Sequence, residues 1–139
     1  MRYWLFKSEP NTWSWDQQVA RGEAGEQWDG VRNYQARNNM REMQLGDRGF
    51  FYHSLSEKAV VGVVEVSALA HPDSTTDDPR WDCVDIKAVG PFATPVTLAD
   101  IKADPRLSDM VLVKNSRLSV QPVTQAEWDI ICAMGDFSA

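Results

Sequence analysis

The chain has 139 residues, a length that suits one domain spanning residues 1–139 and is short for two. Its hydrophobic share of 43% and charged share of 24% are ordinary for a globular protein, which excludes collagen-like, disordered and disulfide-scaffold chains. A net charge of −6 argues against a protein that coats nucleic acid through bulk electrostatics, although a local, shape-based nucleic-acid site stays open.

Membranes, metals and cofactors are not expected. No apolar run approaches the roughly 18–20 residues of a membrane span, and the first residues lack a signal peptide's apolar core, so we expect a cytoplasmic protein. Cys83 and Cys132 lie far apart with no Cys or His at ligand spacing, which fits reduced thiols better than zinc or a disulfide. Gly22, Gly25 and Gly30 lack the spacing of a nucleotide-cofactor loop.

The first third of the chain contains a short aromatic run typical of a strand, residues that can cap helices, and glycines that can end them. Ser14 and Gln17 have the spacing of a capping box, and Gly46 follows an amphipathic segment that it can end. Most of the six tryptophans should pack in the core, but Trp28 falls in a segment that looks solvent-exposed. These signals predict a strand at 3–7, a helix at 15–21, a surface loop at 22–30 and a helix at 35–45.

The middle of the chain is rich in aromatic and β-branched residues. Two such runs are separated by a short polar segment and could pair as a hairpin. A stretch with three Asp and two Pro follows, which is typical of a loop. We therefore expect strands at 49–54, 59–66 and 81–89, with a loop at 71–80.

The last third of the chain combines short apolar runs with two hydroxyl caps. Thr97 and Thr124 each stand three residues before an acid and predict helix starts. The expected elements are a helix to about 103, strands at 110–113 and 117–120, and a helix at 124–135. Strands of mixed spacing interrupted by short helices predict an α+β fold, namely a small, mainly antiparallel β-barrel with peripheral short helices.

His53 and Ser54 are the candidates for nucleophilic catalysis. Neighbouring residues on a strand point to opposite faces, so His53 cannot easily activate Ser54, and the sequence supplies no third orienting group. A histidine at a strand end can equally be a structural residue that bonds the backbone. An enzyme or small-molecule-binding protein that acts on a nucleotide-like ligand through His53 and Ser54 remains the alternative function.

A richer set of functional side chains lies between residues 28 and 40. It combines the Trp28 indole, a glycine, two arginines, and Asn and Gln side chains that both donate and accept hydrogen bonds. Aromatic faces, amides and arginines are the parts of a pocket that stacks a base, reads its edge and binds its phosphate. Two plainer interpretations remain open: a capped amphipathic helix with a polar face, and an interaction module whose aromatic residues only pack.

Four blocks of the chain resemble the signature blocks of the EVE domain. They are Tyr3–Pro10, Trp28–Asn38, Gly46-Asp47 followed by Phe51–Ser54, and Arg117–Val120. The resemblance spans nearly the whole chain in the family's order. It implies a fold of the PUA-like superfold, related to YTH domains, in which a pocket at the barrel's mouth holds a single nucleotide base. Proteins of this family are regarded as readers of modified bases in DNA or RNA.

The resemblance also implies site residues and a partner. We expect a non-enzymatic, monomeric reader that binds nucleic acid carrying a modified base, without a cofactor or a membrane. Three arginines are expected near the nucleic-acid backbone: Arg32, Arg37 and Arg117. The residues expected to bind the base are Lys7, Ser8, Trp28, Asn33, Tyr34, His53, Ser54 and Ser119.

Overall fold

The computed structural model of the chain describes residues 1–137 and confirms the α+β class. Within this range the chain forms six strands, five α-helices and two short 3-10 helices. The strands are β1 (Tyr3–Ser8), β2 (Glu26–Gln27), β3 (Arg48–His53), β4 (Ala59–Pro72), β5 (Asp82–Thr97) and β6 (Val120–Val123). The α-helices are α1 (Trp15–Ala20), α2 (Tyr34–Glu42), α3 (Leu98–Ala103), α4 (Val111–Lys114) and α5 (Gln125–Met134), and the 3-10 helices are Gly22–Ala24 and Pro105–Leu107.

The strands form one mixed sheet that is not closed into the expected barrel. Its strand order is β2-β5-β4-β3-β1-β6, so β2 and β6 are its two edges. β1 pairs with β3 in parallel, while the other neighbouring strands are antiparallel. Closure would require the edges to pair with each other, and both are short, with two residues in β2 and four in β6.

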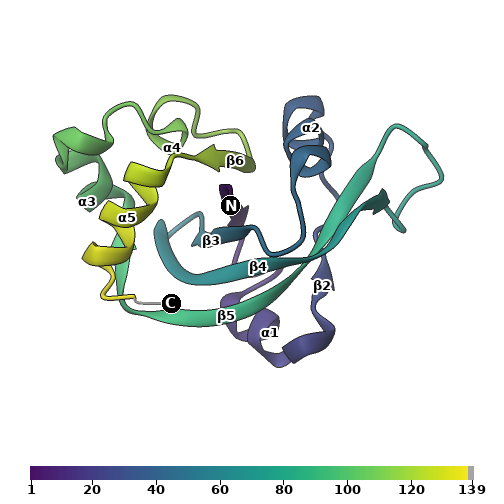
Figure 1. Cartoon of the computed structure of the whole chain (residues 1–139), viewed down its shortest axis with the longest axis horizontal. Coiled ribbons are helices and arrows are strands. Elements are labelled where there is room, and N and C mark those ends of the chain that lie inside the picture. Colours follow the sequence, from purple (N-terminus) through teal and green to yellow (C-terminus); the bar gives the residue numbers. More distant parts are fainter. Residues whose placement is uncertain (138–139) are drawn as a thin grey trace.

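β4 and β5 are much longer than the sequence pattern predicted. They pair from Ala59 and Thr97 at one end to Pro72 and Asp82 at the other, with several register shifts. Such bulges bend and twist a strand pair, and Figure 1 shows the two strands sweeping across the molecule to a protruding hairpin loop. The predicted loop at 71–80 is therefore this hairpin's tip, beginning slightly later than expected.

The sheet separates two apolar cores. Trp4 and Phe6 of β1 contribute to one core and Leu5 to the other, as alternation along a strand requires. The first core includes residues of α1 and α2, and the second includes residues of α3, α4 and α5. In Figure 1 the three later helices gather at one end of the sheet, away from α1 and α2.

The side-chain caps confirm most of the predicted helix starts. Ser14 and Thr124 form complete capping boxes with residues three positions later, and Thr97 accepts a hydrogen bond from the backbone of Asp100. Helix α2 starts after Asn33, whose side chain accepts from Ala36, and it ends at Glu42, before the predicted limit of 45. None of the described helices is both long enough and apolar enough to cross a membrane.

The predicted strand at 110–113 is wrong, because this segment forms helix α4. The carbonyl of Met110 accepts hydrogen bonds from Val113 and Lys114, which closes a helical turn. Leu112 is thereby buried in the second core, so packing overrides the strand preference of the valines. The strand predicted at 117–120 is displaced, and β6 begins at Val120.

Candidate nucleic-acid interface

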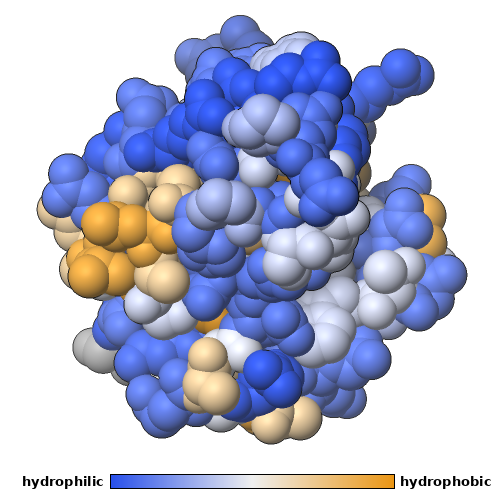
Figure 2. Space-filling model, turned by 90° about the vertical axis from the view of Figure 1, so that its right-hand side faces the viewer, coloured by the Kyte–Doolittle hydropathy of each residue, from blue (hydrophilic) through white to orange (hydrophobic). Residues whose placement is uncertain are grey.

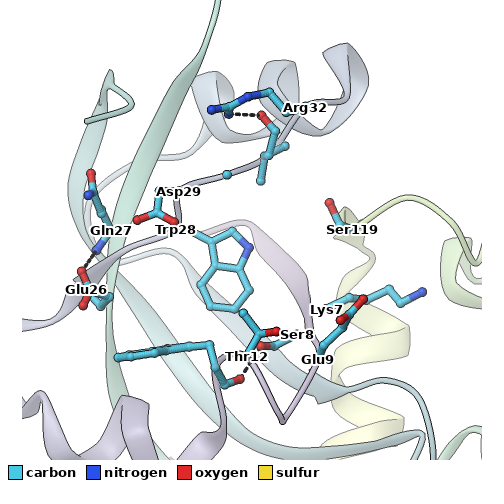
Figure 3. Close-up of a pocket in the computed structure, with 13 residues that line it drawn as sticks. Lys7, Ser8, Glu9, Thr12, Glu26, Gln27, Trp28, Asp29, Arg32 and Ser119 are labelled. Atoms are coloured by element: carbon cyan, nitrogen blue, oxygen red, sulfur yellow. Dashed lines mark hydrogen bonds between the residues drawn. The ribbon is translucent and has the colours of Figure 1, made fainter. Parts of the chain in front are cut away.

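A pocket opens at the C-terminal end of β1, beside the first core. Its volume is about 500 Å³, which lies in the range of small-ligand sites. The end of β1, the segment after it, the chain from β2 to the start of α2, and the loop before β6 all contribute. The lining residues are Lys7, Ser8, Glu9, Thr12, Trp13, Glu26, Gln27, Trp28, Asp29, Gly30, Val31, Arg32 and Ser119 (Figure 3).

Trp28 is both a wall of this pocket and a member of the core. Its backbone N–H donates to the carbonyl of Val84 at 2.8 Å, which continues the short β2–β5 ladder. Its ring makes edge contacts with Phe6 and Phe51, at centroid distances of 5.4 and 5.7 Å. The residue is only 8% exposed, so the expectation of an exposed indole is wrong. Figure 3 shows the indole extending into the pocket, with its nitrogen on the side that faces Ser119.

Trp13 is a second indole in the pocket, and sequence reasoning did not single it out. Its Nε1 donates to Oε1 of Gln18 at 2.9 Å. Gln18 is fully buried and donates in turn to the carbonyl of Ile86 at 3.1 Å. The backbone carbonyl of Trp13 accepts from the hydroxyl of Ser8. A tryptophan so close after the first signature block was the signal that could have marked this residue.

Asp73 orients the segment that carries Trp28, although it comes from the hairpin loop. Its side chain is 1% exposed and accepts from the backbone N–H of Gly30 at 2.8 Å and from Nη1 of Arg32 at 3.1 Å. The backbone and hydroxyl of Thr75 also donate to it. Burial alone would raise the pKa of Asp73, but these hydrogen bonds outweigh it and lower the pKa to about 2. The carboxylate is therefore charged at neutral pH and neutralises Arg32.

The polar groups at the pocket have unequal access to a ligand. Burial lowers the pKa of Lys7, whose ammonium donates to the carbonyl of Ser116. Figure 3 shows this ammonium directed away from Trp28, so mainly the aliphatic part of Lys7 faces the pocket. Burial raises the pKa of Asp29, and the negative charges of Asp73 and Glu26 raise it further. The pocket lining thus combines the indoles of Trp13 and Trp28 with the carboxylates of Glu9, Glu26 and Asp29.

Five of the predicted site residues meet at this pocket: Lys7, Ser8, Trp28, Arg32 and Ser119. Asn33 caps α2 instead, and Tyr34 and Arg37 lie on the surface of that helix. Arg117 is exposed on the loop before Ser119. The pocket residues that the sequence did not single out include Trp13, Glu26 and Asp29.

His53 and Ser54 lie outside the pocket lining and do not bond each other. Nε2 of His53 accepts from the backbone N–H of Trp15 at 3.0 Å, and Nδ1 bonds Glu57. The hydroxyl of Ser54 donates to the carbonyl of Ser8 at 3.2 Å. These bonds give both residues structural roles at the end of β3.

The two cysteines are free and buried. Burial raises the pKa of Cys83 to about 12 and that of Cys132 to about 11, so both thiols are protonated at neutral pH and are weak nucleophiles. Among residues 1–137, no group of three or more His, Cys, Asp or Glu side chains is arranged to hold a metal ion.

The chain is similar to several known proteins in sequence and in structure. The sequence model of the EVE domain matches residues 2–134. Human thymocyte nuclear protein 1 is 34% identical over 164 aligned positions, which cover 95% of this chain and 73% of the relative. The crystal structure of protein Atu2648 from Agrobacterium tumefaciens has a TM-score of 0.96 at 61% identity and covers 97% of this chain and 93% of that one.

A further solved structure, human THYN1, was determined in complex with DNA that contains 5-methylcytosine. It covers 100% of both chains with a TM-score of 0.92 at 33% identity. The YTH domain of Zygosaccharomyces rouxii MRB1 shares the fold at 17% identity, with a TM-score of 0.58 over 99% of this chain and 88% of that one.

Proposed function

The chain belongs to the EVE domain family, as its sequence blocks indicated, and we propose that it is a non-enzymatic reader that takes one modified base of a nucleic acid into the Trp13–Trp28 pocket. The observation that carries this proposal is an open cavity of about 500 Å³ lined by two indoles, in a chain similar to a protein crystallised with methylated DNA. Flat aromatic walls stack bases of any sequence.

The energetics of the pocket suit a base that leaves its stack. Extruding a nucleotide costs a few kcal/mol, and stacking on an aromatic side chain returns about 1–3 kcal/mol per base. A methyl group on the base adds about 0.8 kcal/mol when it is buried, which corresponds to a preference of roughly fourfold over the unmodified base.

The carboxylates of the pocket add a chemical preference. Glu26 and Asp29 place carboxylates in the pocket lining, although that of Glu26 already accepts from the backbone N–H of Gln27, while the ammonium of Lys7 donates to the carbonyl of Ser116. Carboxylates accept hydrogen bonds from the exocyclic amino group of cytosine. The pocket therefore suits amino-bearing bases such as cytosine and adenine better than thymine or uracil.

The test compares two tryptophans of similar burial on opposite faces of the sheet. Trp28 is 8% exposed at the pocket, and Trp128 is 7% exposed in the second core, stacked on Phe50. Binding is measured by fluorescence anisotropy with labelled oligonucleotides that carry one 5-methylcytosine, one N6-methyladenine, or only unmodified bases. Trp28→Phe should weaken binding to the preferred modified oligonucleotide, whereas Trp128→Phe should not.

Two results would contradict the proposal. One is a wild-type protein that binds all the oligonucleotides equally, because a reader must discriminate. The other is an equal loss of binding in both variants, because that would report general destabilisation. Urea unfolding of both variants, followed by circular dichroism, provides the required stability control.

A further inference from the structure

A second surface of aromatic and cationic side chains lies next to the pocket. We name it the Tyr34–Trp81 surface, and it consists of Tyr34, Arg37, Arg80 and Trp81. The rings of Tyr34 and Trp81 stack with a centroid distance of 5.0 Å and an interplanar angle of 21°. Tyr34 is 50% exposed, whereas Trp81 is 9% exposed and supports the Tyr34 ring from below. The surface joins the start of α2 to the end of the hairpin loop.

Two arginines border the ring of Tyr34. The guanidinium of Arg37 lies over the ring, 4.8 Å from its centroid. Nη1 of Arg80 donates to the Tyr34 hydroxyl at 3.2 Å. A planar guanidinium held over an aromatic ring still presents its outer face, and the N–H groups that make no bond within the protein, to a base or a phosphate. Figure 2 shows the end of the molecule that carries α2 and the hairpin, where the upper part is strongly hydrophilic.

The charge of Arg37 distinguishes it from the neighbouring arginines. Arg32 and Arg41 pair with Asp73 and Asp82, at 3.1 and 2.7 Å, and Arg80 also pairs with an aspartate of its own loop. Arg37 instead donates to the neutral carbonyl of Arg80 and to the neutral side chain of Asn38. Among the ion pairs within residues 1–137, none joins Arg37 to a carboxylate, so its charge is available to an anion.

Arg32 connects this surface to the pocket. It lines the pocket, and its guanidinium lies 5.5 Å from the centroid of the Trp81 ring. The Tyr34–Trp81 surface therefore adjoins the pocket on the Arg32 side. Because Asp73 already neutralises Arg32, the first uncompensated cation on that side is Arg37.

We propose that the Tyr34–Trp81 surface binds the nucleotide adjacent to the one in the pocket, with Arg37 contacting its phosphate. This inference rests on the proposed function and extends the contact from one base to two neighbouring nucleotides, which a free nucleoside cannot span. It also assigns the phosphate contact to Arg37 and makes Arg32 a positioning residue.

The test compares two arginines on one helix with two ligands. Arg37→Gln removes the uncompensated charge, and Arg41→Gln is the matched control one turn later, where the charge is paired with Asp82. The ligands are 5-methyl-2′-deoxycytidine, measured by calorimetry, and a single-stranded oligonucleotide that contains the same base. Oligonucleotide affinity is measured over a range of salt concentrations.

Arg37→Gln should weaken oligonucleotide binding about threefold and reduce the slope of log affinity against log salt by about 0.7, as expected for one lost phosphate contact on a single strand. It should leave nucleoside affinity unchanged, and Arg41→Gln should change neither. An unchanged salt slope in Arg37→Gln would overturn the inference. So would a parallel loss of nucleoside affinity, because Arg37 would then act on the pocket or on the fold.

The outcomes also separate this inference from the proposed function. If the protein discriminates modified bases and its oligonucleotide binding does not depend on Arg37, the proposed function stands and this inference fails. If oligonucleotide binding depends on Arg37 but not on base modification, the role of the Tyr34–Trp81 surface stands and the proposed reader function fails. Absence of any oligonucleotide binding would refute both.

Discussion

Replacing Trp28 by alanine tests its structural role, because the residue is a core side chain as well as a pocket wall. A tryptophan buries about 150–250 Å², and at about 25 cal/mol per Å² this corresponds to roughly 4–6 kcal/mol before relaxation. With 8% exposure and edge contacts to two phenylalanines, nearly all of that burial applies here. We expect Trp28→Ala to lower the free energy of unfolding by about 3–5 kcal/mol.

The assay is equilibrium urea unfolding at neutral pH, followed by far-UV circular dichroism. Trp13→Ala is the comparison, because Trp13 lines the same pocket but is only partly buried, and it should cost less. A loss below about 1 kcal/mol for Trp28→Ala would refute the reasoning, because that is the cost of an ordinary surface substitution. A large loss means that only conservative variants, such as Trp28→Phe, can report on binding.

Asp73→Asn should lower the free energy of unfolding by about 1–3 kcal/mol at neutral pH, because it weakens buried hydrogen bonds to Gly30 and Arg32. Because the pKa of Asp73 is lowered to about 2, its contribution to the free energy of unfolding is present above about pH 4 and is lost as the pH falls towards 2. Urea unfolding should therefore show the stabilities of the wild type and Asp73→Asn converging in acid. A stability difference that is independent of pH would contradict this. Gly62→Ala should destabilise the fold by about 1–3 kcal/mol through overpacking, because an added Cβ would lie 2.5 Å from the Trp15 ring. A Tm equal to that of the wild type would show that this ring can move aside.

The predictable parts of the fold are those encoded within a few residues. Capping boxes at Ser14 and Thr124 placed α1 and α5 correctly, because each cap and its partner are three positions apart. The segment at 110–113 was misassigned, because its valines favour a strand locally while the burial of Leu112 is a tertiary effect. The extra length of β4 and β5 was missed for a similar reason, since their pairing stabilises segments with weak alternation.

The candidate site was predictable only in part. Family resemblance indicated Lys7, Ser8 and Trp28, all of which line the pocket. It did not indicate Asp73, which lies 41 positions from Arg32 and in a loop outside the signature blocks. Nothing in the local sequence tells whether an arginine on this face is paired with a carboxylate or is available to a phosphate.

The sequence by itself determined the family, the helix caps and a net charge that argues against bulk binding of nucleic acid. Only the tertiary structure decided that Trp28 is buried, that the sheet stays open and that Asp73 neutralises Arg32. Local signals act through hydrogen bonds and dihedral preferences over a few residues. Burial and charge pairing depend instead on which distant strands and loops meet, and here the protruding β4–β5 hairpin brings Asp73 to the segment that carries Trp28.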